Sequence, residues 1–120
     1  MKRKIKIGRR KYKIELVDKI RSRIKRKEKG ITIGIIKPKQ KIIQIKKIGK
    51  IINKQTLFHE IAHGIMIELT GSAYRASRRA KKPSNQNRLI RYSENFAKLN
   101  SDEEFIDYFG NLLNKTFKLK

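Results

Sequence analysis

The chain has no cysteine among its 120 residues, so neither a disulfide nor a thiolate metal site can form. Any bound metal must therefore be held by histidine and carboxylate side chains, of which there are only 2 and 10. No segment reaches the roughly 18 unbroken apolar residues of a membrane span. The basic N-terminus alternates Lys with Ile and lacks the continuous apolar core of a signal peptide. These absences predict a soluble, cytoplasmic protein without a membrane partner.

Negative charge is scarce: 33 Lys and Arg stand against 10 Asp and Glu, for a net charge of +23. Such a surface attracts polyanions and makes nonspecific nucleic-acid binding one expectation. An AT-rich coding genome, which enriches Lys, Ile and Asn together, is an equally good explanation of the excess. The basic stretch over residues 72–87 has almost nothing to bury and is predicted to be a mobile basic loop. Its basic residues are Arg75, Arg78, Arg79, Lys81 and Lys82.

The N-terminal half predicts strands within a single domain that occupies residues 1–120. Residues 4–7 and 12–16 alternate polar and apolar side chains around a turn that contains Gly8, which predicts a β-hairpin. Residues 31–36 and 41–48 are rich in isoleucine and flank a turn with a proline, which predicts a second hairpin.

The C-terminal half predicts helices. Apolar residues recur at helical spacing over residues 54–69, with Gly71 as the expected stop, and again over 88–99 and from residue 101 onward. The last helix is expected to bury Phe105, Ile106, Tyr108, Phe109, Leu112 and Leu113. A short amphipathic helix over 17–29 completes a basic N-terminal part, residues 1–29. Strands followed by helices predict an α+β fold, with a small antiparallel sheet packed against the helices.

The segment His59-Glu60-Ile61-Ala62-His63 carries the clearest chemical pattern. Histidines four apart on a helix point to a common side, where one zinc ion can bind both. Glu60 lies off that line, so it is placed to act as general base on a zinc-bound water, whose pKa is about 7. Two surface histidines beside a solvated glutamate are the alternative, but these are the only histidines in the chain and both lie in its best amphipathic helix.

A catalytic zinc site needs a third protein ligand. A longer zinc-binding motif, in which a third histidine follows the second one by about six residues, is excluded because Leu69 occupies that position. The remaining candidates are Glu68, Glu94, Asp102, Glu103, Glu104 and Asp107. Glu68 points away from the histidine line, and a capping box from Ser101 to Glu104 would engage Glu104 with the helix backbone. Glu103 then remains as a candidate zinc ligand, although negative charge at a helix start also has a purely stabilising role.

Residues 56–65, Thr-Leu-Phe-His-Glu-Ile-Ala-His-Gly-Ile, resemble the core of small phage and mobile-element zinc peptidases related to the ImmA/IrrE metallopeptidases. The resemblance spans about residues 30–118 and includes a closing helix in which Glu103, Ile106 and Gly110 match the family frame. It implies a minimal zincin-like fold in a bacterial or phage-infected cell, with His59, His63 and Glu103 as zinc ligands. Glu94 is the second candidate for the third zinc ligand, because its segment, residues 93–97, resembles a signature of larger relatives.

Two functions are therefore expected from different classes. The first is a zinc-dependent metallopeptidase that acts on a protein or peptide, such as a regulatory or DNA-associated protein. The second is a basic nucleic-acid-binding protein with a structural or vestigial zinc site. Glu60 separates them, because a purely structural site does not need a general base beside an open coordination position.

Overall fold

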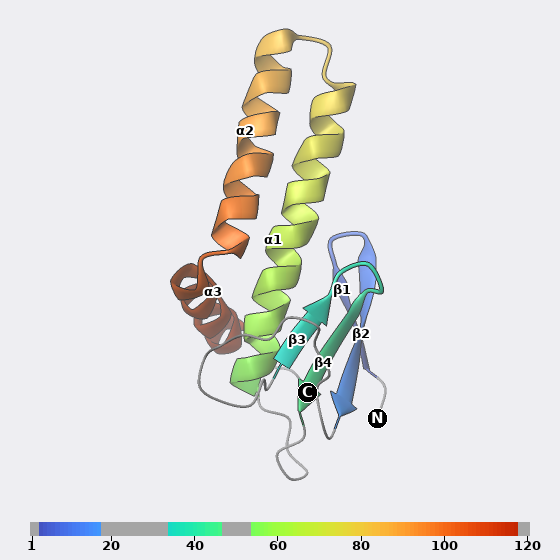
Figure 1. The fold of residues 1–120 in the computed structure, drawn as a ribbon, viewed down its shortest axis with the longest axis vertical. Coiled ribbons are helices and arrows are strands. Elements are labelled where there is room, and N and C mark those ends of the chain that lie inside the picture. Colours follow the sequence, from blue (N-terminus) through green and yellow to red (C-terminus); the bar gives the residue numbers. More distant parts are fainter. Residues whose placement is uncertain (1–2, 18–33, 47–53, 118–120) are drawn as a thin grey trace.

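The computed structural model describes residues 3–17, 34–46 and 54–117. Their order is β1 (Arg3–Ile7), β2 (Arg10–Val17), β3 (Gly34–Lys37), β4 (Ile42–Lys46), α1 (Lys54–Arg79), α2 (Pro83–Asn100) and α3 (Glu103–Thr116). The strands form one sheet beside the three helices, which confirms an α+β fold (Figure 1). The helix predicted over 17–29 lies outside the described residues, apart from Val17, which ends β2.

The sheet consists of two hairpins, as the sequence predicted, although residues 31–33 and 47–48 of the second predicted hairpin lie outside the described residues. β1 and β2 pair antiparallel across a turn in which Gly8 has a φ of 62°, and β3 and β4 also pair antiparallel. The prediction of a purely antiparallel sheet is wrong, because the strand order is β1-β2-β4-β3 and the central pair β2–β4 is parallel. The second strand of each hairpin carries the most deeply buried side chains, and the two hairpins meet through these strands at the centre of the sheet.

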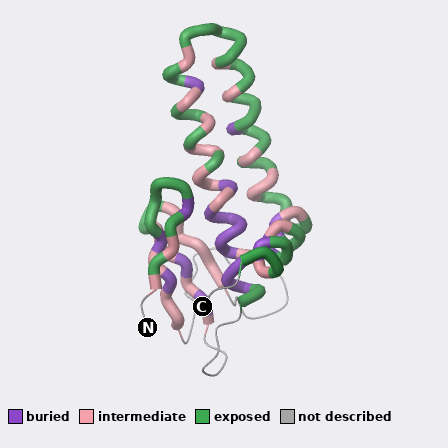
Figure 2. Tube along the Cα trace, turned by 180° about the vertical axis from the view of Figure 1, so that it is seen from behind, coloured by how far each residue is buried: buried purple, intermediate pink, exposed green. Residues whose placement is uncertain are grey.

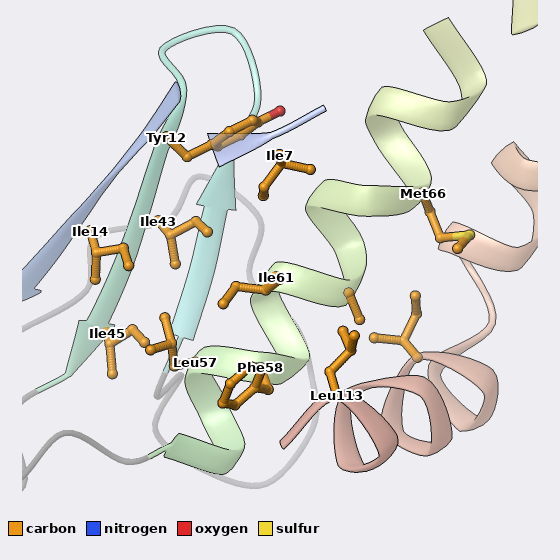
Figure 3. Packing of buried hydrophobic residues seen from close by; sticks show 12 residues of the cluster. Ile7, Tyr12, Ile14, Ile43, Ile45, Leu57, Phe58, Ile61, Met66 and Leu113 are labelled. Carbon is orange, nitrogen blue, oxygen red and sulfur yellow. The ribbon is translucent and has the colours of Figure 1, made fainter. Parts of the chain in front are cut away.

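The hydrophobic core lies between the sheet and the first half of α1. Isoleucines and Tyr12 of the sheet face Leu57, Phe58 and Ile61 of α1, and α3 packs on the other side of that helix (Figure 3). The complete buried set is Ile7, Tyr12, Ile14, Ile43, Ile45, Leu57, Phe58, Ile61, Ala62, Met66, Ile106 and Leu113. This half of α1 is thus held on two sides, which restricts how its polar flank can be oriented.

The second half of α1 corrects the prediction that residues 72–87 form a loop. The helix runs through Gly71 to Arg79, and after a short turn α2 begins with Pro83 at its first positions. The two helices form a hairpin in which the Ser93 hydroxyl donates to the Thr70 carbonyl at 2.9 Å. Contact with α2 stabilises the end of α1 as a helix, although this segment has few apolar residues of its own. This tertiary contact outweighs the weak tendency of a single glycine to end a helix.

The start of α3 also differs from the predicted capping box. Ser101 has helical dihedrals and closes α2, with its N–H donating to the Lys98 carbonyl, so it is not available to cap the next helix. Asp102 is the N-cap instead, and its carboxylate accepts a hydrogen bond from the Phe105 N–H. The buried side of α3 consists of Ile106, Gly110 and Leu113, whereas Tyr108 and Leu112 are exposed. No helix in the described ranges has the length and apolar character needed to cross a membrane.

Candidate metal centre

The two histidines lie one turn apart on the well-packed half of α1. Their ring centroids are 5.0 Å apart, His63 is buried, and His59 is partly exposed. The neighbours Leu57, Phe58 and Ile61 point into the core, and this anchoring turns the histidine side of the helix toward α3. The helical spacing therefore produces the convergence that the sequence predicted.

Glu103 reaches the histidines from the first turn of α3. Its carboxylate oxygens lie 3.2 Å from His59 Nε2 and 3.5 Å from His63 Nε2. The three side chains form a group whose ligand atoms lie within 4.8 Å of one another, so this group can hold a metal ion. The structure thus brings together the three residues that the sequence singled out as ligands.

In each imidazole the outer nitrogen, Nδ1, which is the one not directed at Glu103, has a partner of its own. His59 Nδ1 lies 2.6 Å from Asp107 Oδ1, and His63 Nδ1 lies 2.8 Å from Asn100 Oδ1. An acceptor at Nδ1 favours the tautomer that carries its proton there and leaves the Nε2 lone pair directed at the centre. Metal-binding histidines are commonly oriented by such carboxylate or carbonyl acceptors.

The donor spacing suits a small tetrahedral cation. Zinc–nitrogen bonds of about 2.0–2.1 Å at tetrahedral angles separate neighbouring ligand atoms by about 3.4 Å. The two Glu103–histidine separations, 3.2 and 3.5 Å, lie on either side of that value. Two imidazoles and one carboxylate are also a donor set typical of catalytic zinc, with the fourth position left open.

Glu60 is on the same helix but is not a member of the ligand group. Its side chain is only 7% exposed and faces β3, where a Cβ placed on Gly34 would lie 3.3 Å from Glu60 Oε1 and 2.6 Å from Thr56 Cγ2. The missing side chain at Gly34 therefore lets β3 approach this part of α1 closely. Glu60 is held between the histidine line and the edge of the sheet.

Two of the other carboxylates considered as ligands, Glu68 and Glu94, lie elsewhere. Glu68 accepts hydrogen bonds from the Tyr12 hydroxyl at 2.6 Å and from Lys41 Nζ at 3.4 Å. Burial and the Glu68 carboxylate together raise the pKa of Tyr12 well above its ordinary value, so this pair is a structural contact between sheet and helix. Glu94 is exposed on α2 and does not belong to the ligand group.

Sequence reasoning missed the parts played by Asn100 and Asp107. Asp107 was considered only as a ligand, although its place four residues after Glu103 predicts that both point to the same side of a helix. Asn100 ends α2, and no local pattern indicates that this position meets His63, which is 37 residues away. Only the packing of α2 and α3 around α1 brings it there.

Gly110 sets how closely α3 approaches α1. A Cβ at this position would lie 3.0 Å from the His59 Cα and 3.1 Å from the His59 backbone nitrogen. Gly110 lies two turns after Glu103, so the close contact of backbones holds the metal-facing side of α3 against the histidines. The helix α3 could not sit at this distance with a larger residue there.

Two glycine-to-alanine substitutions should have opposite effects, although both occur inside helices. Gly71→Ala should stabilise the fold by up to about 1 kcal/mol, because alanine favours helix and the only side chain near its Cβ is the flexible Arg75. Gly110→Ala should destabilise by about 1–3 kcal/mol through overpacking against backbone, and should weaken zinc binding. Thermal unfolding and zinc titration of both variants test this contrast, which equal shifts in stability would contradict.

Comparison with protein-family models, curated proteins and solved structures found no match for this chain.

Proposed function

We propose that this protein is a zinc-dependent metallopeptidase with a minimal zincin-like fold, related to the ImmA/IrrE metallopeptidases. The observation that supports it most is the convergence of His59 Nε2, His63 Nε2 and the Glu103 carboxylate, with both outer imidazole nitrogens already engaged. A chance cluster of surface charges would not require partners on the second nitrogen of each ring. The site is built from three helices, each of which contributes at least one of these groups.

Each residue then has a separate role in hydrolysis. His59, His63 and Glu103 hold the ion, and Asp107 and Asn100 keep the two rings in the orientation and tautomer that binding requires. Zinc bound there would supply a Lewis acid and lower the pKa of a coordinated water. Glu60, outside the ligand group and beside it in the chain, accepts the proton of the attacking water and returns it to the leaving amine.

The position of β3 favours a peptide as substrate. β3 pairs with β4 on one side and is the last strand of the sheet among the described residues. Its first residue, Gly34, is the one that lies against Glu60. An extended peptide added along the outer edge of β3 would form backbone hydrogen bonds and bring a carbonyl toward the general base.

The second candidate, a nucleic-acid-binding protein with a structural zinc site, accounts less well for this geometry. Structural zinc sites are usually closed by four protein ligands, whereas three ligands are found together here among the residues that the structure describes. A buried carboxylate directly beside the first histidine also has no function in a structural site. The basic surface can still accompany a peptidase, since the two lie on different parts of the molecule.

Zinc analysis is the direct test of the site. The purified protein should bind about one equivalent of Zn²⁺, and zinc should raise its unfolding temperature because the ion binds only the folded arrangement of α1 and α3. A chelator should reverse the shift and abolish cleavage of a mixture of fluorescence-quenched peptides. Failure to bind zinc would reject the metal centre, and stoichiometric zinc without any chelator-sensitive cleavage would favour the structural alternative.

A further inference from the structure

The α1–α2 hairpin extends well beyond the sheet and the rest of the core. Its far end is flanked by neither the sheet nor α3, and most of its residues are exposed (Figures 1 and 2). Arg79, at the end of α1, lies 16 residues after His63, which corresponds to about 24 Å along the helix. The end of the hairpin is therefore a surface separate from the metal centre.

The far part of this hairpin, residues 69–93, carries positive charge only. No acidic residue occurs between Glu68 and Glu94, and the seven basic residues in that interval are all exposed. They are Arg75, Arg78, Arg79, Lys81, Lys82, Arg88 and Arg91. Two packed helices and the short turn between them carry these charges, in contrast to the mobile loop that the sequence predicted.

Helix stability explains only part of where these charges lie. Arg78 and Arg79 are in the last turn of α1, where positive charge is favourable. Lys81 and Lys82, however, immediately precede α2, and the positive end of a helix dipole disfavours cations there. Lys82 is the N-cap residue and provides no side-chain cap, and the first turn of α2 contains no acidic residue. The turn thus keeps charge that costs stability, which is typical of a functional surface.

Coding composition does not explain it either. AT-rich coding sequence favours lysine over arginine, and outside residues 69–93 the chain has 20 lysines and 6 arginines. Within residues 69–93 the proportion is reversed, with five arginines and two lysines. Arginine is the residue that binds phosphate in a bidentate manner through its planar guanidinium group.

We propose that the far end of the α1–α2 hairpin binds the phosphate backbone of duplex nucleic acid. An anionic membrane is the less suitable polyanion, because interfacial helices bury an apolar face and residues 78–88 contain no large apolar side chain. Two helices side by side are about 20 Å wide, and when laid flat they do not enter a major groove of about 12 Å. Contacts with phosphates rather than base edges make the binding largely independent of sequence.

The test compares two variants that each lose four positive charges. The hairpin variant combines Arg78→Gln, Arg79→Gln, Lys81→Gln and Lys82→Gln. The control combines Lys4→Gln, Lys6→Gln, Arg9→Gln and Lys11→Gln, which are exposed positions of the β1–β2 hairpin. Binding to 20-base-pair DNA and RNA duplexes is measured by fluorescence anisotropy between 50 and 200 mM KCl. Helical content and zinc content of both variants verify that the fold is retained.

In a plot of the logarithm of the binding constant against the logarithm of the salt concentration, we expect the slope of the hairpin variant to be smaller in magnitude by about 3–4. Each lost phosphate contact removes about 0.9 from that slope. Its affinity should fall by about tenfold or more, while the control should keep nearly the parent slope. Equal losses in the two variants would show that attraction depends on total charge and would overturn the proposal. Loss of binding to phosphatidylserine vesicles, with duplex binding unchanged, would identify a membrane surface instead.

Discussion

Glu60→Gln should abolish peptide hydrolysis while leaving zinc bound. The amide is nearly isosteric with the carboxylate, so it fits the space between α1 and Gly34, but it cannot accept a proton from the attacking water. Loss of a general base is expected to lower the rate constant for hydrolysis by about 100- to 10,000-fold. Turnover of fluorescence-quenched peptides by zinc-loaded protein measures the rate, and elemental analysis measures the zinc.

The matched control is Glu94→Gln, the same change at an exposed position of α2 outside the ligand group. It should leave both turnover and zinc content at the level of the parent. If Glu60→Gln loses its zinc, the residue is a ligand and not the base. Full activity in that variant would remove Glu60 from the mechanism altogether.

Glu103→Gln should have the largest effect on metal affinity among the carboxylate variants. Its carboxylate is the only charged donor in the group of three, and zinc binds a neutral amide oxygen poorly. We expect the zinc dissociation constant to rise by more than about 100-fold, beyond the 10- to 100-fold typical of residues that orient a ligand. Asp107→Ala and Asn100→Ala should fall in that smaller range, because each removes only the partner of a histidine nitrogen.

Glu104→Gln is the control that isolates ligation from helix stability. Glu103 and Glu104 both lie in the first turn of α3, so each favours the helix through its dipole, by about 0.3–1 kcal/mol. Only Glu103 belongs to the ligand group. Equal zinc affinity in the two variants would assign Glu103 a purely stabilising role. A larger loss of zinc in Glu94→Gln would place the third ligand on α2.

The helix that carries the histidines could be predicted because its information is local. Apolar residues at helical spacing, from Leu57 to Met66, select one side for the core and leave His59 and His63 on another. The two hairpins were predictable for the same reason, since alternation in the first, isoleucine enrichment in the second and a turn within each are properties of short segments. The relative direction of the hairpins was not, because the parallel pairing of β2 and β4 joins residues far apart in the chain.

The end of α1 was misjudged because a glycine and a run of basic residues are weak evidence against a helix that has a partner. Residues 72–79 remain helical beside α2, where Ser77 is buried and Ser93 bonds to Thr70. Likewise, Ser101 has the chemistry of a cap, but its backbone already closes α2. In both places a contact from a neighbouring helix outweighed the local propensity.

The sequence by itself determined which residues are suited to hold a metal, since with no cysteine and two histidines the ligand chemistry has few alternatives. It also determined that His59 and His63 share one side of a helix, because their spacing matches the helical repeat. Tertiary structure alone decided that Glu103 faces both rings, that Asp107 and Asn100 hold their outer nitrogens, and that the basic stretch is part of a helical hairpin. These contacts depend on how three helices pack, and packing is set by shape complementarity across the whole core and not by any short pattern of residues.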